Sequence, residues 1–191
     1  MQKAGNLSES ERRKNNRIIR FMEEAGKMQI VALDKTGTIT TGEPKVTDIV
    51  PAADITEEEL TQFAATLESK SEHPLAKAIL EYGRERQLEI HEVAEFQSLP
   101  GNGLSAVYKD RKAYAGSMKY IEGLVSIPAQ IQKRAGELAE EGKTPLFFVK
   151  ENQFMGMIAV ADVIKEDGRQ AINELKNMGI HVVMLTGDNE K

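Results

Sequence analysis

The chain contains no cysteine, and this absence removes two kinds of feature at once. Disulfide bonds cannot form, and no thiolate is present to hold a soft metal ion. Long apolar stretches are also missing, because pieces such as 157–161 and 182–185 fall far short of the roughly 18 residues that a membrane-spanning helix needs. Residues 1–28 are charged rather than apolar and are not a secretory signal. Any membrane passage or soft-metal binding by a parent protein is therefore expected elsewhere.

Positive charge is in deficit, with 25 Lys and Arg residues against 30 Asp and Glu residues and a net charge of -5. This balance argues against a general nucleic-acid surface, so nucleic acid is not an expected partner. A polyanionic ligand would have to bind at a small, locally positive part of the surface. With 191 residues, of which 40% are hydrophobic, the chain can bury a core as one large domain or two small ones.

The stretch Asp34-Lys35-Thr36-Gly37-Thr38 directly follows a short apolar run. This context predicts a buried parallel strand that delivers a carboxylate to its C-terminal end, where α/β sheets place their ligands. An aspartate there can act as a nucleophile toward a phosphoryl group. The glycine lets backbone N–H groups approach an anion, the threonines offer hydroxyls and the lysine adds positive charge. Any three of these residues would equally suit a strand that ends in a turn.

The triplet Thr186-Gly187-Asp188 follows a second apolar run, 180–185, and repeats the same pattern. Two such strand ends lying side by side would make a cradle for a phosphate group. Taken alone, the triplet fits an ordinary turn as well as a site.

Together, the two motifs resemble the haloacid-dehalogenase-like phosphorylation domain of P-type ATPases. The resemblance implies that ATP phosphorylates Asp34, that Thr186 binds the transferred phosphoryl group, and that Asp34 and the Thr36 carbonyl bind Mg²⁺. Related soluble phosphatases carry a second Asp at the position of Thr36, where it acts as a general acid. Without that acid the phosphoaspartate is less readily hydrolysed. The catalytic set implied by the resemblance is completed by Lys35, Thr38, Gly187 and Asp188.

A second group of motifs lies in the middle of the chain, beginning with Ser-Glu-His-Pro-Leu-Ala at 71–76. Pro74 is suited to the first position of a helix, so His73 would project from the helix entrance, although a histidine there is equally an ordinary cap. The run resembles the nucleotide-binding domain of heavy-metal P-type ATPases. By that resemblance His73 orients the adenine and Glu68 hydrogen-bonds the base. The glycines that would approach the nucleotide are Gly101, Gly103 and Gly116.

The resemblance extends from about residue 30 to the end of the sequence. Because a glutamate precedes His73, this motif is most similar to that of copper(I) pumps. It implies ATP and Mg²⁺ as cofactors, the membrane and metal-binding parts of the same pump as partners, and the cytoplasmic face of a membrane as location. In the family, a lysine and a Gly-Asp-Gly-x-Asn-Asp segment follow the Thr-Gly-Asp triplet. We therefore expect an incomplete phosphorylation domain here.

The expected fold class is α/β and α+β, with a partial, Rossmann-like phosphorylation domain and an inserted nucleotide-binding domain built on an antiparallel sheet with helical hairpins. The expected domains are a helical lead-in at 1–28, the phosphorylation domain at 29–43 and 158–191, and the nucleotide-binding domain at 44–157. Helices are predicted at 56–68, 74–87, 127–141 and 167–178. Strands are predicted at 30–33, 46–50, 90–96, 104–108, 112–115, 144–150, 153–160 and 180–185.

Two other functions fit parts of the sequence. One is a freestanding phosphotransferase of the haloacid-dehalogenase type, and the other is a nucleotide-binding module without turnover. Acid-stable labelling by radioactive ATP separates the pump from the binding module, because the intact pump would form an aspartyl phosphate and the module would not.

Overall fold

The computed structural model of the protein describes residues 29–185, so the predicted lead-in at 1–28 and Thr186, Gly187 and Asp188 lie outside the described residues. The chain divides into two compact units. The smaller unit comprises the described residues up to Ile39 and from Lys165 onward, and the larger unit comprises 40–164. The sequence placed the domain boundaries at 43/44 and 157/158, which lie inside two continuous strands, β2 (Thr40–Pro51) and β7 (Gln153–Ile164).

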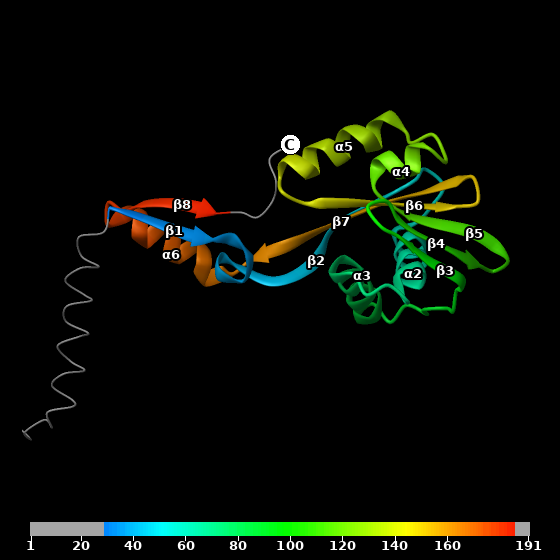
Figure 1. The fold of residues 1–191 in the computed structure, drawn as a ribbon, viewed down its shortest axis with the longest axis horizontal. Coiled ribbons are helices and arrows are strands. Elements are labelled where there is room, and N and C mark those ends of the chain that lie inside the picture. The colour runs from blue at the N-terminus through cyan, green and yellow to red at the C-terminus, as the bar shows by residue number, and fades with distance from the viewer. Residues whose placement is uncertain (1–28, 186–191) are drawn as a thin grey trace, which may run out of the picture. The chain divides into compact units, whose positions relative to one another are not determined.

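The smaller unit contains a parallel strand pair and one helix. Strand β1 (Ile30–Asp34) leads into a short π-helical turn, η1 (Lys35–Ile39), and helix α6 (Glu166–Asn177) leads into β8 (His181–Leu185). The two strands pair in parallel, with Asp34 opposite Leu185, and α6 packs along β8 (Figure 1). The C-terminal ends of the two predicted strands therefore do lie side by side.

The prediction that strand β1 is buried is wrong, and β8, although apolar in sequence, is also largely exposed. Burial alternates along β1, and Ile30 and Val183 remain 64% and 47% exposed. The physical reason is that the described part of this unit has a two-stranded sheet and a single helix, which cannot cover both faces.

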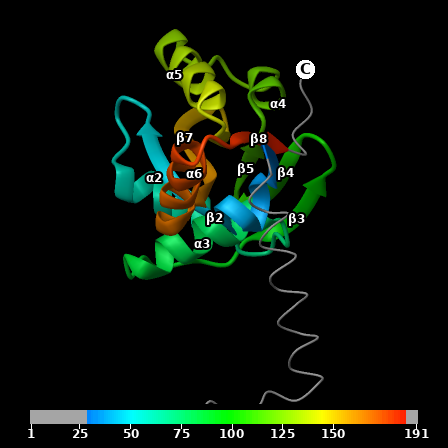
Figure 2. The ribbon, with the colours of Figure 1, turned by 90° about the vertical axis from the view of Figure 1, so that its left-hand side faces the viewer.

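The larger unit is built on a six-stranded antiparallel sheet with the order β2-β7-β6-β5-β4-β3. The remaining strands are β3 (Ala94–Leu99), β4 (Gly103–Tyr108), β5 (Arg111–Gly116) and β6 (Thr144–Lys150). Helices α2 (Glu57–Glu68) and α3 (Pro74–Glu85) cover one face, and α4 (Met118–Glu122) and α5 (Ala129–Glu140) cover the other (Figures 1 and 2). The predicted fold class is confirmed.

The starts of α2 and α3 follow from local sequence. Thr56 caps α2 through a bond from the Glu59 backbone N–H to its hydroxyl, and the Glu59 side chain accepts from the Thr56 backbone N–H in return. This is the reciprocal capping box that satisfies two otherwise unpaired donors. At α3, Pro74 occupies the first turn and His73 is the N-cap.

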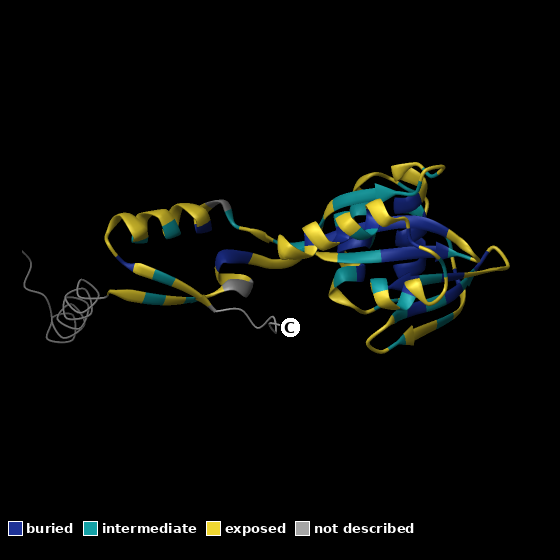
Figure 3. Cartoon of the chain, turned by 90° about the horizontal axis from the view of Figure 1, so that it is seen from above, coloured by how far each residue is buried: buried dark blue, intermediate teal, exposed yellow. Residues whose placement is uncertain are grey.

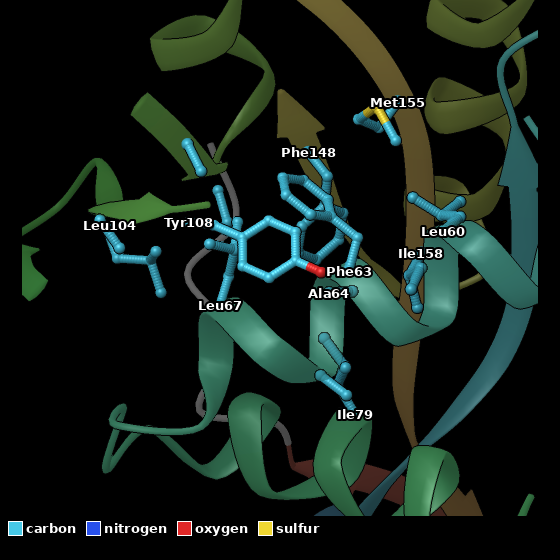
Figure 4. Packing of buried hydrophobic residues seen from close by; sticks show 14 of the residues in the cluster. Leu60, Phe63, Ala64, Leu67, Ile79, Leu104, Tyr108, Phe148, Met155 and Ile158 are labelled. Carbon is cyan, nitrogen blue, oxygen red and sulfur yellow. The ribbon is translucent and has the colours of Figure 1, made fainter. Parts of the chain in front are cut away.

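The sheet buries side chains on both of its faces because successive residues of a strand point in opposite directions. In β6, Phe148 packs with α2 and α3, whereas Phe147 and Val149 pack with α5. Figure 3 shows the buried residues in dark blue, gathered inside the larger unit. Figure 4 shows Phe148 beside Phe63, Leu60 and the ring of Tyr108 in the first of these cores.

The open end of the β2–β7 pair is fixed by one carboxylate. Asp162 accepts from the buried Thr40 hydroxyl at 2.5 Å and from the Gly42 backbone N–H at 2.9 Å. The register shifts between Thr40 and Pro44, so these bonds hold an irregular stretch of β2 onto β7.

Three details differ from the sequence prediction. The strand expected at 90–96 is β3, which begins at Ala94, and the strand expected at 46–50 extends over the whole of β2. The five-residue α4 was not predicted, because it is too short to show a helical period. Within 29–185, none of the helices has the length and apolar character needed to cross a membrane.

Candidate functional site

The larger unit holds a cavity of about 310 Å³, which lies where two helix ends meet one part of the sheet. Its walls come from the end of α2, the start of α3, the β3–β4 turn, the end of β5 and the start of β6. All five residues that the sequence proposed for nucleotide binding line this one cavity: Glu68, His73, Gly101, Gly103 and Gly116.

Glu68 is the last residue of α2, and only 6% of its surface is exposed. Burial in the cavity wall raises the pKa of its carboxyl to about 7, although a hydrogen bond with the Ser71 side chain acts to lower that pKa. Near neutral pH this carboxyl is therefore present in both its protonated and its ionised form.

His73 is held at the entrance to α3 by its role as N-cap. Its Nδ1 accepts a hydrogen bond from the Leu75 backbone N–H at 3.2 Å, and its own backbone N–H donates to the Ser71 hydroxyl at 3.4 Å. Because Nδ1 acts as an acceptor, the neutral ring carries its proton on Nε2. The exposed imidazole thus offers one N–H donor at the cavity.

The glycines bring two backbone segments into unusually close contact. A methyl group on Gly103 would overlap the carbonyl of Ala115, and a methyl group on Gly116 would overlap the carbonyl of Asn102. That same Asn102 carbonyl accepts from the Ser117 backbone N–H at 2.9 Å. The turn between β3 and β4 is therefore fastened to the end of β5, and only glycine permits the approach at these two positions.

The rest of the lining is apolar or hydroxyl-bearing, and no Lys or Arg occurs among its described residues. Sequence reasoning missed the wall formed by β6, namely Thr144, Pro145 and Leu146. No local motif marks these residues, because the pairing of β6 with β5 is what brings them to the site.

In the smaller unit, Asp34 ends β1 with its side chain exposed. Gly37 adopts a φ of 74° in the turn that follows, and its carbonyl accepts from Lys165 Nζ at 2.8 Å. Sequence reasoning did not single out Lys165, whose one signal is its position just before a predicted helix. The turn places Thr38 on the surface, while the side chains of Lys35 and Thr36 and the whole Thr186 triplet lie outside what the structure describes.

The described residues around Asp34 do not by themselves define a metal site. A strand-end carboxylate is a hard oxygen ligand of the kind that Mg²⁺ prefers. Within 29–185, however, no group of three or more His, Cys, Asp or Glu side chains could hold a metal ion. Asp34 and Thr36, which the sequence proposed as Mg²⁺ ligands, thus do not complete a metal site within the described residues.

Comparisons with known proteins agree with the sequence motifs. Residues 28–191 match the haloacid dehalogenase-like hydrolase family. The chain is 40% identical over 90% of its length to a copper-exporting P-type ATPase of Staphylococcus epidermidis, and 41% identical over 89% to a probable copper-importing P-type ATPase A of Enterococcus hirae. It spans 21% and 23% of the lengths of these relatives.

A solved structure is similar over most of the chain. A zinc-transporting PIB-type ATPase in its E2.Pi state superposes with a TM-score of 0.76 and 35% identity, covering 86% of this chain and 26% of that protein. The resemblance to heavy-metal P-type ATPases that the motifs indicated is therefore confirmed.

Proposed function

Because the chain belongs to the haloacid dehalogenase-like hydrolases, we propose that it is the nucleotide-binding and phosphorylation region of a heavy-metal-transporting P-type ATPase. The observation that carries the proposal is the convergence of Glu68, His73 and the three glycines on one cavity. These residues belong to separate sequence motifs that lie between Glu68 and Gly116. In this proposal ATP and Mg²⁺ are the cofactors, and the membrane and metal-binding parts of the same pump are the partners.

The cavity is suited to the base of the nucleotide. Leu75, Leu104 and Leu146 supply apolar walls for a flat ring, and Glu68 and His73 supply hydrogen-bonding groups for its edge. Because no cation occurs among the described lining residues, this cavity would hold the nucleoside and leave the phosphates free.

Asp34 is the proposed nucleophile. One of its carboxylate oxygens would attack the γ-phosphorus of ATP, forming an acyl phosphate, while the bond from that phosphorus to the bridging oxygen breaks and ADP leaves with the electron pair. The exposed position of this carboxylate at the end of β1 leaves it accessible for such an attack. A bound Mg²⁺ would supply charge neutralisation of the phosphates, with Asp34 as one ligand and further ligands from outside the described residues.

Copper is the proposed cargo of the parent pump, since two of the similar proteins are named as copper transporters. This chain has no cysteine and so offers no thiolate ligand for Cu(I). Stimulation of ATP hydrolysis by Cu(I) but not by Zn(II) in the full-length pump would support this assignment, and the opposite preference would overturn it.

Calorimetric titration of the chain with ATP tests the binding site. Two substitutions at His73 separate its possible roles: His73→Asn keeps an N-cap acceptor for α3 but shortens the side chain, whereas His73→Ala removes both functions. We expect both variants to bind ATP at least about tenfold more weakly, a loss of about 1.4 kcal/mol. Unchanged affinity in both would remove His73 from the site.

Phosphorylation is tested in the full-length pump with ATP labelled in its γ-phosphate. Asp34→Asn should abolish acid-stable labelling and leave ATP binding intact, because the amide keeps the shape of the side chain but is not a nucleophile. Asp54→Asn, at an exposed carboxylate in the larger unit, serves as the matched control and should label normally. Persistent labelling of the Asp34 variant would show that another residue is the acceptor.

A further inference from the structure

Glu68 is an isolated acidic group in a cavity wall. It is 6% exposed, and it is the final residue of α2, where the negative end of the helix dipole disfavours a carboxylate. Among the described lining residues no Lys or Arg is available to compensate a negative charge. This position therefore favours the neutral carboxyl.

The charged groups nearby are committed to other partners. Lys70 donates from Nζ to the Val93 carbonyl at 2.7 Å, and Lys143, just before the β6 wall, lies 2.8 Å from carboxylate oxygens of both Asp48 and Glu141. The other titratable group in the described lining is His73, which faces the cavity from the start of α3. Ser71 offers a hydroxyl to the Glu68 carboxyl, and it serves either protonation state.

The protonation state decides which base edge a carboxyl can match. A neutral carboxyl has one O–H donor and one carbonyl acceptor side by side, and adenine presents the complementary pair, the N1 acceptor and the exocyclic N–H donor. An ionised carboxylate has acceptors alone, which suit the adjacent N–H donors of guanine instead. One side chain would thus prefer different purines in its two states.

We propose that Glu68 selects adenine through its neutral carboxyl, so that binding of an adenine ring above neutral pH is accompanied by uptake of one proton at this residue. The inference rests on the nucleotide-binding function proposed above. The pKa of about 7 that burial gives Glu68 in the free protein supports it independently of the base. Gln at this position has the same donor and acceptor arrangement as a neutral glutamic acid and cannot titrate.

The experiment is calorimetric titration of the chain with adenosine and with guanosine at pH 6.5 and pH 8.0. Nucleosides are used because they have no phosphate that titrates in this range. Repeating each titration in buffers with different ionisation enthalpies gives the number of protons taken up on binding. The variants are Glu68→Gln and, as a matched control, Glu72→Gln, which changes an exposed carboxylate outside the cavity lining.

For the unsubstituted chain we expect adenosine to bind about tenfold more weakly at pH 8.0 than at pH 6.5, with uptake of about one proton at the higher pH. The preference for adenosine over guanosine should fall over the same interval. Glu72→Gln should behave in the same way. Glu68→Gln should bind adenosine with nearly equal affinity at both pH values and without proton uptake.

Adenosine binding that is independent of pH and releases or takes up no proton would overturn the inference and leave the nucleotide site standing. Loss of adenosine binding at pH 6.5 in Glu68→Gln, with the variant folded by thermal unfolding, would also overturn it. Failure of the unsubstituted chain to bind adenosine at either pH would reject the proposed nucleotide site itself, and the inference with it.

Discussion

Lys143 Nζ lies 2.8 Å from a carboxylate oxygen of Asp48, which ties the segment before β6 to strand β2. Arg134 of α5 reaches the other carboxylate oxygen at 3.1 Å. Burial alone would raise the pKa of Asp48, but hydrogen bonds from Lys143 and Thr47 and the two nearby cations bring that pKa below its ordinary value of 3.8. The carboxylate thus holds α5 and the β6 segment against the sheet.

We predict that Asp48→Asn lowers the free energy of unfolding at pH 7 by about 1–2 kcal/mol, because two cations lose a partly buried anionic partner. In the unsubstituted chain the contribution of this carboxylate is present above pH 3.8 and is lost as the pH falls through the lowered pKa of the folded state. Urea denaturation measures the change. Asp54→Asn, which alters an exposed carboxylate, should fall within about 0.5 kcal/mol of the original chain; an equal loss in both variants would contradict the prediction.

The contribution of Glu68 to stability should depend on pH in the opposite direction to that of Asp48. Since its pKa is raised from 4.5 to about 7, the folded state binds more protons than the unfolded state in this interval. The stabilisation is complete below pH 4.5 and is lost as pH rises through 7, by at most about 3 kcal/mol. Glu68→Gln should therefore be more stable than the original chain at pH 8 and should lose this pH dependence. Glu58→Gln, at an exposed position of α2, should retain the pH dependence of the original chain. Denaturation curves at pH 5, 6.5 and 8 measure the free energy of unfolding of each variant, and the same pH dependence in both variants would contradict the prediction.

The cavity glycines Gly103 and Gly116 should tolerate an added methyl group far less well than Gly136 of α5 does. Gly103→Ala and Gly116→Ala each create an overlap with a carbonyl, so we expect losses of about 1–3 kcal/mol and weaker ATP binding. Gly136→Ala, in α5 with no neighbour within 4 Å of the added carbon, should instead stabilise the chain by about 0.5–1 kcal/mol. Thermal unfolding and calorimetry check both effects, and equal tolerance at all three positions would refute the close approach.

Affinity should depend little on the phosphates. Because no Lys or Arg occurs among the described lining residues, AMP, ADP and ATP should bind the chain with dissociation constants within about threefold of one another. Removal of Mg²⁺ by a chelator should leave these values unchanged, since the 29–185 region offers no cluster of three metal-ligating side chains. Strict Mg²⁺ dependence in calorimetric titrations would show that a metal site already forms in this chain.

Much of the fold could be read from local signals. The capping box at Thr56, the proline at the start of α3 and the hairpin expected from the runs 144–150 and 153–160 gave correct elements, because each depends on a few neighbouring residues. The juxtaposition of Asp34 with the end of β8 followed from two similar strand ends, and the register confirms it.

Features that depend on distant contacts could not be predicted. The order of the six strands places β6 beside β5, and this pairing brings Leu146 to the cavity. No sequence motif marks Leu146 as a cavity residue. The raised pKa of Glu68 likewise requires knowledge of what surrounds the end of α2. Recognition of the glycines came from the family resemblance, whereas the overlap that a methyl group would cause is visible only in three dimensions.

The larger unit joins the rest of the chain at Thr40 and Ile164, two residues that pair directly across β2 and β7. If the chain is pulled at these two ends, the hydrogen-bonded pairs between β2 and β7 are loaded one after another and not all at once. The first rungs to be loaded include the bonds that Asp162 accepts from Thr40 and Gly42. The bonds of this one carboxylate would therefore be among the first to break when the larger unit is unfolded by force.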